Sequence, residues 1–358
     1  MHGRGLALRF LVTGAVLVLA PTAAAQSTYT PGRTAWGDPD FRGTWPIDRI
    51  FDANIPLERP ENFGDRLWLT DDEFAERLGA ARFADGVVTR DVVERGTTGL
   101  ADWLQSTPYG RRTSMLISPA NGRVPPLTPQ AEALHRAGRT SWKAENPIDW
   151  VTDIDVYDRC VSRGFPTSML PFPYNNGIRV FQSPGFVVLQ LEILGTRVIP
   201  VGQAEHWPEA VRGWLGQSRG RWEGNTLVIE TTNMVAGDSA SDDVMKRAAT
   251  PLQGRTRVTI PMSEKASAVE RLTMTGPDTI AYAVTYTDPE VFTAPWTIEL
   301  EWTRNAGYRL HEFACHEGNG VRNMITASRA QRQSGEVVAG ARPEDGLGNW
   351  SFPGVAPQ

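Results

Sequence analysis

Two short polar segments, residues 158–177 and 311–320, hold most of the side chains that could do chemistry in this chain. Each segment contains one of the two cysteines, Cys160 and Cys315. The N-terminal residues indicate an exported chain, and in an oxidising compartment we expect these cysteines to form a disulfide. A free nucleophilic thiol and a metal ligand are the alternatives. The disulfide would bring the two polar segments together.

Acid–base catalysis is the chemistry that the joined segments would suit. The pairing would place Arg159 beside His316 and Glu317, and a cation, an imidazole and a carboxylate at one site can move protons. We expect His316 to transfer the proton and Glu312 or Glu317 to orient it. Arg159 and Tyr174 would stabilise developing negative charge. The structural alternative is an ion pair between Arg159 and Glu317.

Four further polar residues are candidates for binding the substrate: Asn175, Asn176, His206 and Asn319. The two adjacent asparagines precede Gly177, and Asn-Asn-Gly is also a common turn sequence. His206 is a lone histidine, for which a structural role is the alternative. We therefore expect these side chains to supply hydrogen bonds at the site or to shape the loops around it.

The sequence predicts neither a metal nor a cofactor at this site. His311 and His316 are separated by one residue more than in the zinc-binding H-E-x-x-H motif. On a strand the two histidines would point to opposite faces, whereas Glu312 and His316 would share one face and could look into a barrel. No dinucleotide fingerprint, phosphate-binding loop or serine-nucleophile elbow is present.

The second half of the chain must position both polar segments, and it alternates apolar and polar residues as β-strands do. Tight turns are expected at residues 223–225 and 275–278. Antiparallel strands in sequence order predict a mainly β fold, an up-and-down, lipocalin-like barrel of about eight strands. A β-sandwich is the alternative. The expected strands cover residues 178–182, 186–193, 197–201, 220–222, 226–232, 266–274, 279–288, 295–304 and 308–315.

The first half of the chain is expected to be coil with a few helices. Thr70 and Glu73 form a capping box at the start of one helix. Thr128, followed by Pro129, begins another helix. The chain then divides into a signal peptide (1–25), a coil and helical segment (26–150), a β-barrel domain (151–332) and an extended C-terminal tail (333–358).

The N-terminus has the three parts of a cleavable secretory signal. Arg4 and Arg9 supply positive charge, residues 10–20 are an apolar run, and Ala23 and Ala25 fit the small-residue cleavage site. The run is shorter than the roughly 20 apolar residues of a membrane-spanning helix. We therefore expect a periplasmic or secreted protein without a membrane span.

The charge balance argues against nucleic acid as a partner. The formal net charge is −5, and it becomes −7 when the two arginines of residues 1–25 are removed. A mildly acidic protein has no electrostatic attraction for nucleic acid or an anionic membrane. The partner expected is a small-molecule substrate or ligand, and the sequence predicts no oligomeric state.

Several motifs together resemble a large family of exported bacterial proteins of unknown function. They are RCVSRG, PYNNG, WLGQSRGRWEGNTLVIETTN, PWTIELEW and HEFACHEGN, and the resemblance covers most of the chain after residue 25. It implies no particular activity. Residues 221–223 fall in an expected hairpin and could be architectural. The resemblance implies a signature of Arg159, Cys160, Tyr174, Asn175, Arg221, Trp222, Glu223, Asn233, Glu270, Arg271, His316, Glu317 and Asn319.

Two classes of function are compatible with these features. The first is a cofactor-independent lyase, isomerase or hydrolase that acts on a small apolar or aromatic compound, such as a plant-derived aromatic ether or ester. The second is a lipocalin-like carrier of an apolar ligand, since barrels of this size can enclose one small molecule. Convergent titratable groups favour the enzyme.

Overall fold

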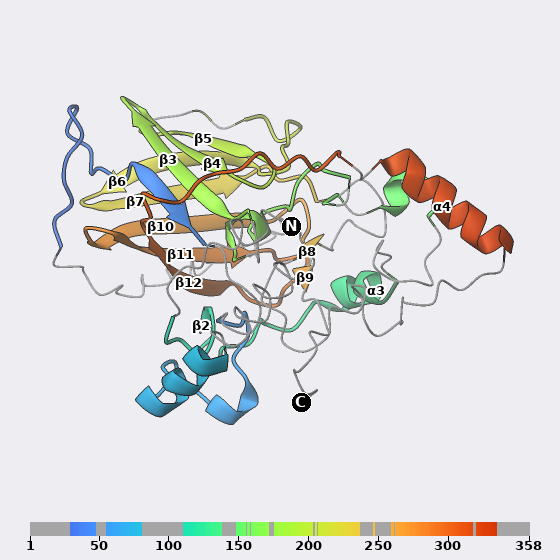
Figure 1. Ribbon diagram of the computed structural model, residues 1–358, viewed down its shortest axis with the longest axis horizontal. Coiled ribbons are helices and arrows are strands. Elements are labelled where there is room, and N and C mark those ends of the chain that lie inside the picture. The colour runs from blue at the N-terminus through green and yellow to red at the C-terminus, as the bar shows by residue number, and fades with distance from the viewer. Residues whose placement is uncertain are drawn as a thin grey trace, which may run out of the picture.

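Two antiparallel β-sheets form the centre of the molecule, and their strands run in roughly one direction in Figure 1. The first sheet contains β1 (Gly43–Pro46), β3 (Gly177–Ser183), β4 (Phe186–Leu191) and β5 (Thr196–Pro200), in that order. The second contains β2 (Leu116–Ser118), β12 (Trp296–Thr303), β11 (Thr279–Thr287), β10 (Ser267–Gly276), β7 (Thr226–Thr232) and β6 (Gln217–Glu223). A small pair joins β8 (Lys246–Arg247) to β9 (Thr259–Ile260).

The structure is a computed structural model, and most of the chain after residue 28 is described. The described residues are 29–47, 55–80, 110–137, 148–154, 156–157, 159–171, 175–202, 205, 207–236, 246–247, 259–260, 262–317 and 320–334. The predicted signal peptide therefore lies outside them. Within these ranges, no helix has the length and apolar character needed to cross a bilayer.

The predicted alternation of inward and outward side chains is confirmed in the long strands. Inward positions of β11 and β12 are buried at every second residue, from Ile280 to Tyr286 and from Trp296 to Trp302. β10 and β11 form the expected hairpin, in which Leu272 lies opposite Tyr282. Eight of the nine expected strands occur, and β1 and β2 arise in the region for which coil and helix were expected.

The two sheets approach one another at both edges but do not form a single closed ladder among the described residues. At one edge, after β5, Gly202 N–H donates to Gly220 O of β6 at 2.9 Å. At the other edge, after β12, Asn305 N–H donates to Thr44 O of β1 at 3.0 Å. The mainly β prediction is confirmed, and the arrangement fits a sandwich as well as a barrel.

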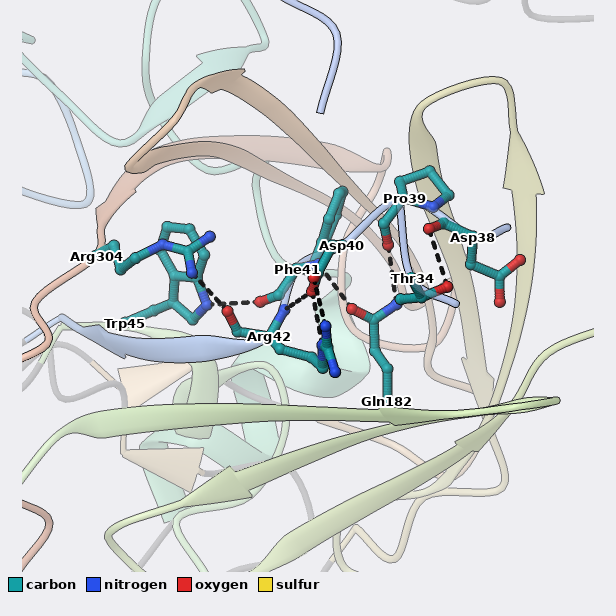
Figure 2. Close-up of polar contacts among 9 residues, drawn as sticks. All are labelled: Thr34, Asp38, Pro39, Asp40, Phe41, Arg42, Trp45, Gln182 and Arg304. Atoms are coloured by element: carbon teal, nitrogen blue, oxygen red, sulfur yellow. Dashed lines mark hydrogen bonds and ion pairs between the residues drawn. The ribbon is translucent and has the colours of Figure 1, made fainter. Parts of the chain in front are cut away.

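Figure 2 shows how the segment of residues 34–45 is hydrogen-bonded to both sheets. Arg304, which follows β12, donates from Nη1 to Arg42 O at 2.6 Å, and its guanidinium carbon lies 4.5 Å from the centre of the Trp45 ring. Gln182 of β3 accepts a hydrogen bond from Phe41 N–H at 2.7 Å. The segment is thus fixed across the edge where β1 meets β12.

Large aromatic side chains fill the space between the sheets. Tyr282 stacks on Trp302 with ring centres 4.6 Å apart, and both side chains are inaccessible to solvent. A side chain with no accessible surface has no water-sized space against it, so these positions do not line a ligand cavity. The largest fully buried side chains include Phe41, Trp45, Phe165, Tyr282, Tyr286, Trp296 and Trp302.

Both helix starts expected from the sequence are confirmed. Residues 71–80 are helical. Thr70 N–H donates to a Glu73 carboxylate oxygen at 2.8 Å, and Glu73 N–H donates to Thr70 Oγ1 at 3.3 Å. Helix α3 (Pro129–Ala137) begins after Thr128, whose Oγ1 accepts from Ala131 N–H. Short 3₁₀ turns occur at η2 (Glu61–Phe63), η3 (Val151–Asp153) and η4 (Thr167–Met169).

Helix α4 (Val321–Ser334) was not expected, because its sequence has few apolar residues. No residue of α4 is buried, and Figure 1 shows it at one end of the molecule, away from the sheets. Asp149 pairs with Arg329 and Arg332 of α4. These exposed ion pairs contribute little each.

Candidate functional site

A disulfide joins the two polar segments that the sequence singled out. Cys160 and Cys315 are bonded, with their Cα atoms 5.6 Å apart across 155 residues of chain, and this confirms the predicted pairing. Cys160 lies in a tight turn, in which its N–H donates to Tyr157 O at 2.9 Å and its φ is +62°. The bond brings Arg159 and His316, the sequence neighbours of the two cysteines, into the same region of the molecule.

The side chains expected to do acid–base chemistry lie on the surface. Glu312, His316 and Glu317 are exposed, and residues 308–315 do not form the strand predicted for them. The expectation that Glu312 and His316 look into a barrel is therefore wrong. The physical reason is that β2 already occupies the free edge of β12, where a further strand would have paired.

A buried carboxylate, Glu192, fixes the segment that carries His316. Its side-chain oxygens accept hydrogen bonds from Tyr308 Oη at 2.7 Å and from His311 N–H at 2.7 Å. Asn175 Nδ2 donates to it at 3.1 Å and Gly177 N–H at 2.9 Å. Glu192 is only 7 % exposed. The exposed segment is thus held twice, by the disulfide and by these charge-assisted hydrogen bonds.

The two asparagines expected to bind substrate are buried. Asn175 holds Glu192, and it adopts a left-handed φ of +48° in the loop before β3. Asn176 accepts from Arg163 Nη1 at 3.1 Å and donates to Leu170 O at 2.9 Å. In the structure both side chains therefore serve the loops that surround the disulfide. Arg159 is half-buried next to Cys160.

Three of the predicted site residues lie outside the described residues. These residues are Tyr174, His206 and Asn319. The described residues contain no group of three or more His, Cys, Asp or Glu side chains placed to hold a metal ion.

A buried pair of opposite charges lies between the sheets. Arg197 of β5 forms a bidentate ion pair with Glu270 of β10, at 2.8 and 2.5 Å, and also donates to Ser218 and Thr231. Tyr282 Oη donates to Glu270 at 2.8 Å. Burial and the neighbouring carboxylate raise the pKa of Tyr282 well above its usual value. This network is a cross-link between the sheets.

One member of this network, Glu270, was among the residues singled out from the sequence. Glu270 and Arg271 are adjacent on β10 and point to opposite faces, and Glu270 is the inward one, with no exposed surface. The partner was missed, although Arg197 shares strand parity with the buried Ile199. A charged residue at an inward position of one strand was the signal for a second charge opposite it.

Other members of the implied signature are architectural in the structure. Arg221 pairs with Glu223 and Glu230 on the outer face of the six-stranded sheet, and Arg271 pairs with Glu223. Trp222 meets the edge of Phe41, with ring centres 5.4 Å apart. Asn233 belongs to the implied signature but was not predicted as a site residue. Its side-chain amide donates to the carbonyls of residues 208 and 211.

A small cavity opens beside the end of β12, and none of the predicted site residues lines it. Its volume is about 50 Å³, well below the several hundred cubic ångströms of a typical small-molecule pocket. The Arg112 guanidinium lies over the ring of the half-exposed Trp68, 4.5 Å from the ring centre. Arg112 also pairs with Glu299. The lining residues are Ile47, Ile55, Trp68, Gly110, Arg111, Arg112, Pro171, Leu300, Glu301 and Thr303.

Comparison with known proteins adds no relative: no protein-family model, curated protein or solved structure matches this chain. The resemblance to an exported bacterial family stays a prediction carried by the motifs quoted above.

Proposed function

We propose that this protein is an exported, cofactor-independent enzyme that performs acid–base chemistry at the surface around the Cys160–Cys315 disulfide. One observation carries the proposal. Residues 309–317 are exposed or half-buried, and yet this segment is held by a covalent bond at Cys315 and by a buried carboxylate that accepts from Tyr308 and His311. Exposed loops usually gain such restraint where side chains must be positioned for binding or catalysis.

The residues beside the disulfide take the chemical roles. His316 transfers the proton, because imidazole is the side chain whose ordinary pKa lies nearest neutral pH. Glu317 or Glu312 orients the imidazole, and Arg159, half-buried on the other side of the disulfide, stabilises negative charge that develops on the substrate.

The substrate proposed is a small apolar or aromatic compound, such as a plant-derived aromatic ether or ester. It would bind at the end of the sheets, because aromatic side chains and the Arg197–Glu270 pair fill the space between them. The filled interior weighs against a lipocalin-like carrier. The hydrogen bonds at both sheet edges support a flattened barrel as the scaffold, and the disulfide supports a periplasmic or secreted location.

A substrate screen on the mature protein tests the proposal. Purified protein, dialysed against EDTA, is incubated with aryl acetates, esters of phenolic acids and aryl ethers, and released phenols are measured. We expect turnover of at least one class without added metal or nucleotide. The absence of turnover in every class, combined with tight binding of an apolar fluorescent dye, would favour the carrier instead.

A further inference from the structure

The outer faces of the two sheets differ sharply in charge. The outer face of the six-stranded sheet carries a set of charged side chains, several of them ion-paired: Arg219, Arg221, Glu223, Glu230, Arg271, Glu299 and Glu301. On β3, β4 and β5 the outward positions contain a single charged residue, Arg179, whose Nε donates to Thr44 Oγ1. Both faces belong to one molecule, so average composition does not explain the contrast.

An apolar stripe crosses the uncharged face. Phe181, Val188 and Val198 lie opposite one another on three neighbouring strands, and Phe186 lies opposite Pro200 in the next row. These five residues are the apolar stripe. Phe181 and Phe186 are each 45 % exposed and Val198 is 58 % exposed. Figure 1 shows these strands along the upper side of the molecule. A contiguous exposed apolar patch of this kind usually marks an interaction surface.

We propose that the apolar stripe is the centre of a two-fold dimer interface with a second copy of this chain. The chain carries a net charge of −5, so two copies repel unless they meet where charge is absent. The stripe offers such a place. Its polar neighbours Gln190, Thr196 and Ser183 can form the rim that interfaces place around an apolar centre.

The strand order makes the face self-complementary. A two-fold axis along the middle strand, β4, sets β3 of one copy against β5 of the other. Phe181 then packs against Val198, a large side chain against a smaller one, and Val188 meets its own counterpart. Sheets stacked in this way lie about 10 Å apart.

The area indicates a weak dimer. The stripe presents on the order of 300 Å² of apolar surface, whereas a standard stable interface buries about 800 Å² on each partner. The rim must supply the remainder. We therefore expect a dimer that dissociates in the micromolar range rather than an obligate one.

Sedimentation equilibrium of the mature protein, from about 1 to 300 µM, tests the dimer. Wild type is expected to move from monomer to dimer over this range. Val198→Lys is expected to raise the dissociation constant at least tenfold, because it buries an unpaired charge against Phe181 of the other copy. The matched control is Val269→Lys, since Val269 is a 40 % exposed strand valine on the charged face. It is expected to dimerise as wild type does.

Two results would overturn the dimer. The first is a wild-type monomer throughout the range, including the case in which only a chain lacking residues 335–358 dimerises, since the tail would then be the occupant. The second is equal dimerisation of both lysine variants. Circular dichroism checks that each variant is folded.

Discussion

Glu192 and Glu270 are both buried carboxylates, but they have different partners and connect different parts of the fold. Glu270 faces the Arg197 guanidinium and ties two sheets together, whereas Glu192 accepts four hydrogen bonds from uncharged donors and ties a surface segment to the fold. The sequence singled out Glu270 only as a member of the signature that the resemblance implies. It did not identify Glu192, because the donors to that residue come from segments more than 100 residues apart, and their approach depends on tertiary structure.

Replacing Glu270 with Gln should strongly destabilise the protein. The substitution leaves the Arg197 charge buried without a counter-charge, and breaking a buried pair in this way costs about 3–5 kcal/mol. Glu230→Gln is the control, because Glu230 pairs with Arg221 on the exposed face and should cost at most about 1 kcal/mol. Urea unfolding measures both free energies. Similar losses in the two variants would mean that the buried pair is not special.

Replacing Glu192 with Gln should loosen the segment that carries His316. Each carboxylate oxygen accepts two of the four hydrogen bonds, so an amide nitrogen would face two donors, and each charge-assisted hydrogen bond lost costs about 2 kcal/mol. We expect faster amide exchange at His311 and faster reduction of Cys160–Cys315 by dithiothreitol. Glu312→Gln, exposed on the same segment, serves as the control. Unchanged exchange in the Glu192 variant would show that the disulfide alone holds the segment.

At the scale of elements, strands and helices with a local sequence signal were predicted, whereas strands that form only by pairing with a distant strand were missed. Period-two alternation located β3 to β7 and β10 to β12, and capping residues located two helix starts. β1 and β2 were missed because they are short and lack alternation, and they form through pairing with β3 and β12. The same pairing by β2 left no edge for the strand expected at residues 308–315.

The helix of residues 71–80 should be sensitive to acid through Glu73. Hydrogen bonds from Arg66 and from Thr70 lower the pKa of this carboxyl from 4.5 to about 2. Because the pKa is depressed in the folded protein, the stabilisation is complete above about pH 4.5 and disappears as the pH falls towards 2.

Hydrogen exchange of residues 71–80 at pH 6 and pH 3 measures this dependence. Wild type is expected to lose protection at the lower pH, and Glu73→Gln is expected to remove most of the difference. Glu76→Gln, on the exposed side of the same helix, should behave as wild type. A pH dependence that survives in the Glu73 variant would assign it to another group.

At the scale of the whole molecule, the space between the two sheets is filled, and the proposed chemistry is assigned to the loops around the disulfide. Aromatic rings and a buried ion pair fill the space between the sheets, which fits the proposal that the sheets position the loops and that the substrate binds outside them. The disulfide closes a loop of 155 residues, which in the chain-entropy model stabilises by about 5 kcal/mol. Alternation of apolar and polar residues predicted the mainly β class, and the export signal predicted the disulfide. Neither could predict how far the interior is filled, which depends on the packing of specific side chains.

The most direct test of the proposed function is chemical rescue of the His316→Ala variant on the best substrate of the screen. We expect kcat/KM to fall about 100-fold or more, the typical contribution of a general acid–base group, and added imidazole to restore part of it. Arg309→Ala, exposed on the same segment, should keep wild-type activity. Full activity in His316→Ala, or a loss equal to that of Arg309→Ala, would contradict the assignment of proton transfer to His316.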